Sequence, residues 1–79
     1  MPTVLRVEGF TFKVIPADHD PPHVHVRYGG ASAIVDIVSE ATRDARRMND
    51  PDLRRAQELV REHRDELLEA WLAIQARTR

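Results

Sequence analysis

The 79-residue sequence contains no cysteine. This absence excludes disulfide bonds, thiolate zinc sites and thiol nucleophiles, and it fits a reducing compartment. The sequence also lacks an apolar run long enough to span a bilayer and lacks a signal-peptide pattern, so we expect a soluble, cytoplasmic protein that does not enter a membrane. The formal net charge is −1, which argues against a general affinity for polyanions.

Length sets a second limit. A chain of 79 residues makes one domain, residues 1–79, with a small hydrophobic core. Domains of this size without disulfides often gain stability by association. We therefore expect a small protein partner, a homo-oligomer, or both.

Residues 1–38 alternate between apolar and polar side chains in four stretches, which is typical of β-strands. Glu8-Gly9 and Gly29-Gly30 separate neighbouring stretches and are typical of tight hairpin turns. The predicted strands run from Thr3 to Glu8, from Phe10 to Ile15, from His23 to Tyr28 and from Ala31 to Val38.

The second half of the chain has helical periodicity. Asn49 or Asp50 is a suitable N-cap, Pro51 suits the first turn, and apolar residues then recur every three or four positions. This pattern predicts one helix over residues 50–77, with residues 39–49 as a connector. The predicted fold class is α+β: a four-stranded, mainly antiparallel β-meander packed against one long C-terminal amphipathic helix. The residues expected to form the core between them are Phe10, Phe12, Leu53, Val60, Leu67 and Trp71.

Candidate chemistry is concentrated between Asp18 and Tyr28. His23 and His25 are two residues apart on a predicted strand, so both imidazoles project from one face of it. One interpretation is a site for a divalent transition metal, because two imidazoles accept zinc, nickel or non-haem metals when a third ligand joins them. The candidate ligands are His19, His23, His25 and Asp18.

Two other interpretations of the same stretch remain open. His23 and His25 can act as an acid–base pair on a phosphodiester, with Arg27 or Arg6 stabilising negative charge, as in a ribonuclease-type toxin. Alternatively, the histidines are structural and the stretch is a contact surface for a partner. The residues do not decide whether the protein is an enzyme.

The segment from residue 41 to 55 is the only basic stretch of the chain. Arginine side chains suit phosphate groups, so this stretch is a weak candidate for nucleic-acid binding. Its five arginines are Arg43, Arg46, Arg47, Arg54 and Arg55.

Several motifs together resemble one protein family. They include the start from Met1 to Arg6, the Pro21-Pro22-His23-Val24-His25 core and the C-terminal Leu67-Leu68-Glu69-Ala70-Trp71. This combination resembles the small bacterial family called domain of unknown function 4160, over nearly the whole chain. The resemblance implies a small protein associated with toxin–antitoxin systems that acts through a partner, and it implies no catalytic residues.

Overall fold

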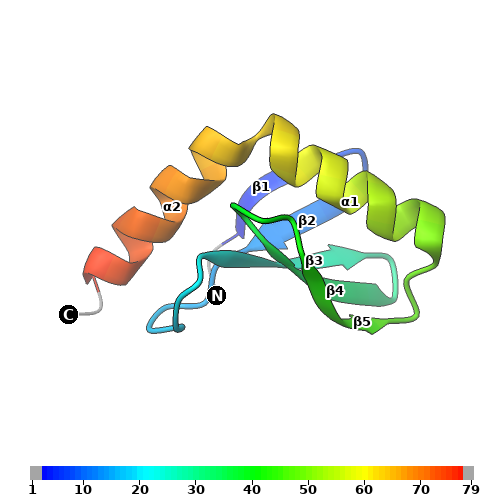
Figure 1. Ribbon diagram of the computed structural model, residues 1–79, viewed down its shortest axis with the longest axis horizontal. Helices are drawn as coiled ribbons and strands as arrows, with labels where there is room; N and C mark the ends of the chain where they lie inside the picture. Colours follow the sequence, from blue (N-terminus) through cyan, green and yellow to red (C-terminus); the bar gives the residue numbers. More distant parts are fainter. Residues whose placement is uncertain (1–2, 78–79) are drawn as a thin grey trace.

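Five strands and two helices form the part of the chain that the computed structural model describes, residues 3–77 (Figure 1). The strands lie side by side in chain order and each pairs antiparallel with the next, so the sheet is a meander. The predicted α+β class with an antiparallel meander is confirmed. The elements are β1 Thr3–Val7, β2 Phe10–Lys13, β3 His23–Tyr28, β4 Ala31–Asp36, β5 Thr42–Arg46, α1 Asp50–Glu62 and α2 Arg64–Arg77.

The two predicted hairpin turns are present. Glu8 and Gly9 both have positive φ, 55° and 84°, which is the backbone of a type I′ turn and joins β1 to β2. A Cβ on Gly9 would lie 3.1 Å from the ring of Tyr28, so this position favours glycine for space as well as for φ. The second turn begins at Gly29, which has φ 60° and follows the last residue of β3.

The prediction of four strands was wrong, because β5 forms a fifth strand within the predicted connector. Its residues pair with β4, with Thr42 opposite Val35 and Arg43 opposite Ile34. All of them except Thr42 are exposed, so this edge strand has no alternation of apolar and polar side chains. It is held by backbone pairing with β4, and its charged side chains suit a sheet edge.

The prediction of one long helix was also wrong. The helix begins where expected, with the Asn49 side chain accepting a 2.9 Å hydrogen bond from the Asp52 N–H, but α1 ends at Glu62 and α2 starts after a break at His63. The break could not be predicted from the sequence, because apolar residues that become buried recur at helical spacing on both sides of it. Within residues 3–77, neither helix has the length and apolarity needed to cross a membrane.

The core lies between one face of the sheet and the two helices (Figure 1). Phe10 packs on Phe12, with ring centroids 6.5 Å apart, and stacks on Tyr28 at 4.3 Å. Val60, Leu67 and Trp71 belong to this core as predicted, whereas Leu53 is only half-buried and the prediction for it was wrong. The remaining members include Val14, Val24, Val26, Val35, Ile37, Ala56 and Leu59.

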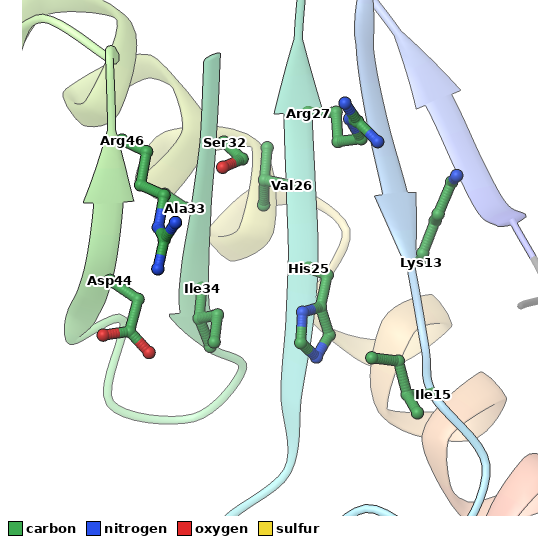
Figure 2. A pocket seen from close by; sticks show the side chains of 10 residues that line it. All are labelled: Lys13, Ile15, His25, Val26, Arg27, Ser32, Ala33, Ile34, Asp44 and Arg46. Carbon is green, nitrogen blue, oxygen red and sulfur yellow. The ribbon is translucent and has the colours of Figure 1, made fainter. Parts of the chain in front are cut away.

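The other face of the sheet is not covered by the helices. Figure 2 looks onto this face, which we call the open face. Side chains from β2, β3, β4 and β5 stand on it around a hollow of about 380 Å³. The residues that line this hollow include Lys13, His25, Arg27, Ser32, Ile34 and Arg46.

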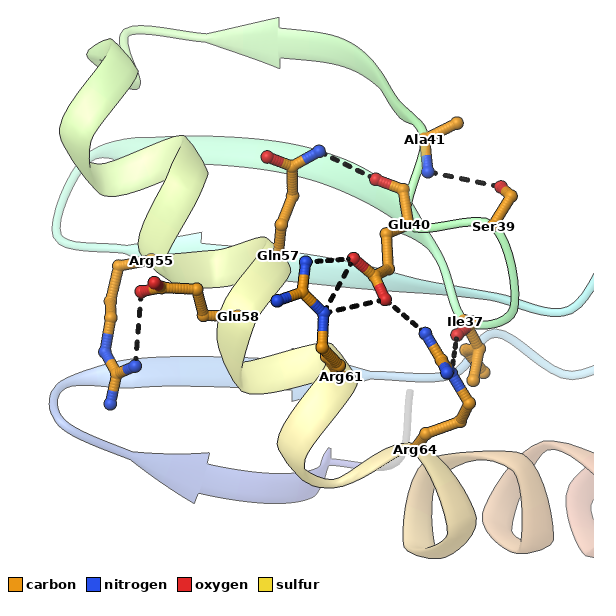
Figure 3. A network of polar contacts seen from close by, with 9 residues as sticks. All are labelled: Ile37, Ser39, Glu40, Ala41, Arg55, Gln57, Glu58, Arg61 and Arg64. Carbon is orange, nitrogen blue, oxygen red and sulfur yellow. Dashed lines mark hydrogen bonds and ion pairs between the residues drawn. The ribbon is translucent and has the colours of Figure 1, made fainter.

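Glu40 joins the β4–β5 connection to both helices (Figure 3). Its carboxylate accepts hydrogen bonds from Arg61, the shortest at 2.7 Å, and from Arg64. Arg64 also donates to the Ile37 carbonyl oxygen at 2.9 Å, and Gln57 donates to the Glu40 carbonyl oxygen at 2.8 Å. Because Arg61 and Arg64 lie on either side of the helix break, this network ties the break to the sheet.

We expect Glu40→Gln to destabilise the fold at neutral pH and to matter less in acid. Hydrogen bonds from Arg61 outweigh partial burial and, helped by Arg64, hold the pKa of the Glu40 carboxyl below its ordinary value of 4.5. A carboxyl whose pKa is lower in the folded state stabilises the fold above the ordinary pKa, and this stabilisation is lost as pH falls through the lowered value.

Urea unfolding of the wild type and Glu40→Gln at a series of pH values measures this effect. The difference in free energy of unfolding should be full at neutral pH and shrink below 4.5. Glu69→Gln is the matched control, because Glu69 is exposed on α2. A difference for Glu40→Gln that persists unchanged in strong acid would contradict the assignment.

Candidate metal centre

The loop between β2 and β3 folds back onto the start of β3. Asp18 donates its N–H to the Ile15 carbonyl oxygen at 3.3 Å, after Ala17 with φ 64°. Gln75 of α2 donates to the same carbonyl oxygen at 3.1 Å, so the second helix also anchors the loop. The Asp20–Pro21 peptide bond is cis. This path returns the Asp18 side chain to the first residues of β3.

Asp18, His23 and His25 meet at one point. A single carboxylate oxygen, Asp18 Oδ2, lies 2.8 Å from His23 Nε2 and 3.2 Å from His25 Nε2. The two imidazole rings are 5.4 Å apart, and the three potential ligand atoms all lie within 4.8 Å of one another. Among residues 3–77 this is the only such group of three. We call it the Asp18–His23–His25 cluster.

The His23 side chain is buried and contacts Trp71, Pro21 and Asp18. Its side chain is only 7% exposed, and its ring lies 5.1 Å from the ring of Trp71 on α2. Its Nδ1 is 2.8 Å from the Pro21 carbonyl oxygen, while Nε2 faces the Asp18 carboxylate. Both ring nitrogens therefore face hydrogen-bond acceptors, and a neutral imidazole has only one N–H to donate.

The environment of Asp18 favours the carboxylate form. Burial would raise the pKa of this carboxyl, but the hydrogen bonds from His25 and His23 outweigh burial and hold the pKa below its ordinary value of 3.8. Asp18 is therefore ionised at neutral pH, which is the form that binds metal ions. Its side chain and that of His25 are each 28% exposed, so solvent reaches this side of the cluster.

His19, the fourth residue predicted as a ligand, lies outside the cluster. It is exposed in the same loop and lines a separate hollow of about 500 Å³ between the loop and α2. Asp18 and Trp71 also line that hollow. His63, at the break between the helices, is far along the chain from the cluster and lies 3.5 Å from Glu66.

The arginines predicted to bind phosphate lie on different surfaces. Arg27 lies on the open face and lines the same hollow as His25. Arg6 lies on that face too, because Thr11 is directly opposite both Arg6 and Arg27 in the strand register.

The five arginines of the basic stretch do not gather at one place. Arg43 pairs with Asp36 at 3.2 Å. Arg55 pairs with Glu8 and with acids of its own helix, Arg46 lies on the open face, and Arg47 and Arg54 are exposed.

Sequence reasoning missed two of the contacts that fix His23. The Pro21 carbonyl oxygen is a backbone group whose direction depends on the loop, and no residue pattern indicates it. Trp71 is 48 positions away in the chain, and its helical periodicity predicted only that it would be buried in the core. Its contact with His23 depends on where the break at His63 directs α2.

Comparison with known proteins gives one match. The family model described as "Domain of unknown function (DUF4160)" matches residues 9–72. No curated protein and no solved structure matches the chain. The matched range contains the Asp18–His23–His25 cluster, β2 to β5, α1 and the part of α2 that carries Leu67 and Trp71. The chain therefore belongs to the family of the domain of unknown function 4160.

Proposed function

We propose that this domain binds a divalent transition metal ion through the Asp18–His23–His25 cluster. The observation that carries the proposal is the position of His23, with both ring nitrogens facing acceptors. A metal ion at Nε2 satisfies both nitrogens of a neutral imidazole, because Nδ1–H then donates to the Pro21 carbonyl oxygen and the Nε2 lone pair binds the ion. Metal-binding histidines commonly donate their second N–H in this way, which fixes the ring orientation.

The distances support the same assignment. Two ligands at about 2.1 Å from an ion lie about 3.0 Å apart at the right angle of an octahedral site and about 3.4 Å apart at the tetrahedral angle that zinc prefers. Asp18 Oδ2 is 2.8 Å and 3.2 Å from the two Nε2 atoms. Two imidazoles and one carboxylate suit Zn²⁺ or Fe²⁺. Three protein ligands leave positions for water or a substrate, which is typical of catalytic metal sites and not of structural ones.

The burial of His23 favours a metal ligand over an acid–base residue. A general acid or base must come within hydrogen-bond reach of the reacting group. His23 is 7% exposed and is held at both nitrogens, whereas His25 is 28% exposed. The ribonuclease-type mechanism with His23 and His25 as the reacting pair is therefore the less favoured alternative.

Elemental analysis of the protein purified without a histidine tag tests the proposal. We expect about one equivalent of zinc or iron per chain in the wild type, and a loss of most of it in Asp18→Asn and His25→Ala, because each variant removes one ligand atom. His63→Gln is the matched control, since it removes a histidine outside the cluster. Equal metal content in all four proteins would contradict the proposal, as would absence of metal from the wild type after zinc is added.

The remaining expectations from the sequence and from the family resemblance stay predictions. They are an association with a toxin–antitoxin system, a small protein partner or a homo-oligomer, and a cytoplasmic location. The metal proposal does not depend on any of them, because all three ligands belong to one chain.

A further inference from the structure

One row of residues crosses all five strands on the open face. The register pairs Arg6 of β1 with Thr11 of β2, and Thr11 with Arg27 of β3. Arg27 in turn lies opposite Ser32 of β4, and Ser32 opposite Arg46 of β5. Directly opposite residues in antiparallel strands share a face, so the row alternates arginine and hydroxyl. Adjacent strands are about 4.8 Å apart, and the row is therefore about 19 Å long.

The guanidinium groups of the three arginines in this row have no hydrogen bond or ion pair with any residue in the described range 3–77. The ammonium group of Lys13, beside His25 in the adjacent row of the same face, has none either. Arg55, Arg61 and Arg64, by contrast, each contact at least one glutamate. The protein thus pairs these helix arginines and leaves the cations of the row unpaired, although like charges close together on a sheet face are unfavourable.

The face is also concave where the row crosses the centre of the sheet. Arg27, Ser32 and Arg46 line the hollow together with Lys13 and His25 (Figure 2). Asp44 is the one acid of the described residues that line this hollow. More than half of the acidic residues lie in the two helices. The net charge of −1 therefore conceals a basic face.

We propose that the open face binds the sugar–phosphate backbone of single-stranded nucleic acid, with the strand running along this row. Arginine forks and hydroxyl groups are the side chains that commonly contact phosphate oxygens. A row of about 19 Å is longer than a single phosphate group needs and suits a chain of phosphates. This inference goes beyond the metal proposal, because binding along the row needs no metal ion.

The side chains of the open face also indicate how it would recognise a nucleic acid. The four aromatic residues lie elsewhere: Phe10, Phe12 and Trp71 are in the core, and Tyr28 stacks on Phe10. Stacking of bases on Phe, Tyr or Trp rings, which supplies much of the affinity at other single-strand sites, is therefore not available on this face. Binding by the row therefore depends on phosphate contacts, is indifferent to base composition and weakens with salt.

Fluorescence anisotropy with labelled oligo(dT) of about ten nucleotides tests the proposal, with a chelator present so that the result is independent of the metal centre. We expect the logarithm of the association constant to fall with the logarithm of salt concentration with a slope of about −2 to −3, for three or four cations. Arg27→Gln should weaken binding about two- to five-fold and flatten the slope by about 0.7. The triple variant at Arg6, Arg27 and Arg46 should flatten the slope by about 2.

Arg54→Gln is the matched control, because Arg54 is exposed on α1, away from the open face. It removes the same charge and should leave affinity and slope unchanged. An equal loss in Arg54→Gln, a flat salt response, or no binding at low salt would overturn the proposal. Adenosine monophosphate that binds as tightly as the oligonucleotide would also overturn it and would indicate a site for a small phosphate.

Discussion

Zn²⁺ at about a thousand times its dissociation constant is expected to raise the free energy of unfolding by about 4 kcal/mol. The reason is that the three ligand atoms meet only in the folded chain, where a loop folds back onto β3. An ion that binds the folded state and not the unfolded state shifts the equilibrium by mass action. For a domain of this length the total stability is roughly 4–12 kcal/mol, so this gain is large.

Urea unfolding with and without zinc measures the gain, and addition of a chelator should abolish it. Asp18→Asn should show little or no gain, because a neutral amide replaces the carboxylate whose oxygen both histidines share, and zinc is bound by carboxylates and not by amides. His63→Gln should keep the full gain, since His63 lies outside the cluster. A gain of the same size in Asp18→Asn would mean that zinc binds elsewhere.

Phe12→Ala is expected to lower the free energy of unfolding by about 3–5 kcal/mol and so to leave much of the protein unfolded. Phe12 is fully buried on β2, between Leu5 and Val26 on the neighbouring strands. Removal of the ring leaves a cavity under the helices that the remaining core cannot fill without moving the sheet. Unfolding of this core should also remove the contact between Trp71 and His23 of the cluster, because Trp71 packs in the same core as Phe12.

Two controls separate the cavity from a general effect of substitution. Phe12→Leu keeps most of the volume and should cost less than about 1.5 kcal/mol. Leu72→Ala removes an apolar side chain that is 61% exposed on α2, and it should change stability by no more than about 0.5 kcal/mol. Equal losses in Phe12→Ala and Phe12→Leu would contradict the role of packing volume assigned to this ring.

Local patterns were sufficient for the first four strands, their turns and the start of the first helix. Alternation over β1 to β4 reports which side chains are buried on one face, and Gly9 marks a turn that needs positive φ. The same alternation places His23 and His25 on one side of β3, and the loop length allowed Asp18 to be considered as a ligand. These features depend on residues close together in the chain, so the sequence by itself determines them.

The fifth strand, the helix break and the completed cluster were decided only by the tertiary structure. β5 is exposed and is held by pairing with β4, so it has no apolar period. The break at His63 lies within a continuous apolar stripe and is tied to the sheet through Glu40. The arginine row requires the register of five strands. A sequence pattern reports which side chains are buried. These features depend instead on backbone pairing and on contacts between distant residues, and neither produces a periodic pattern of apolar residues in the sequence.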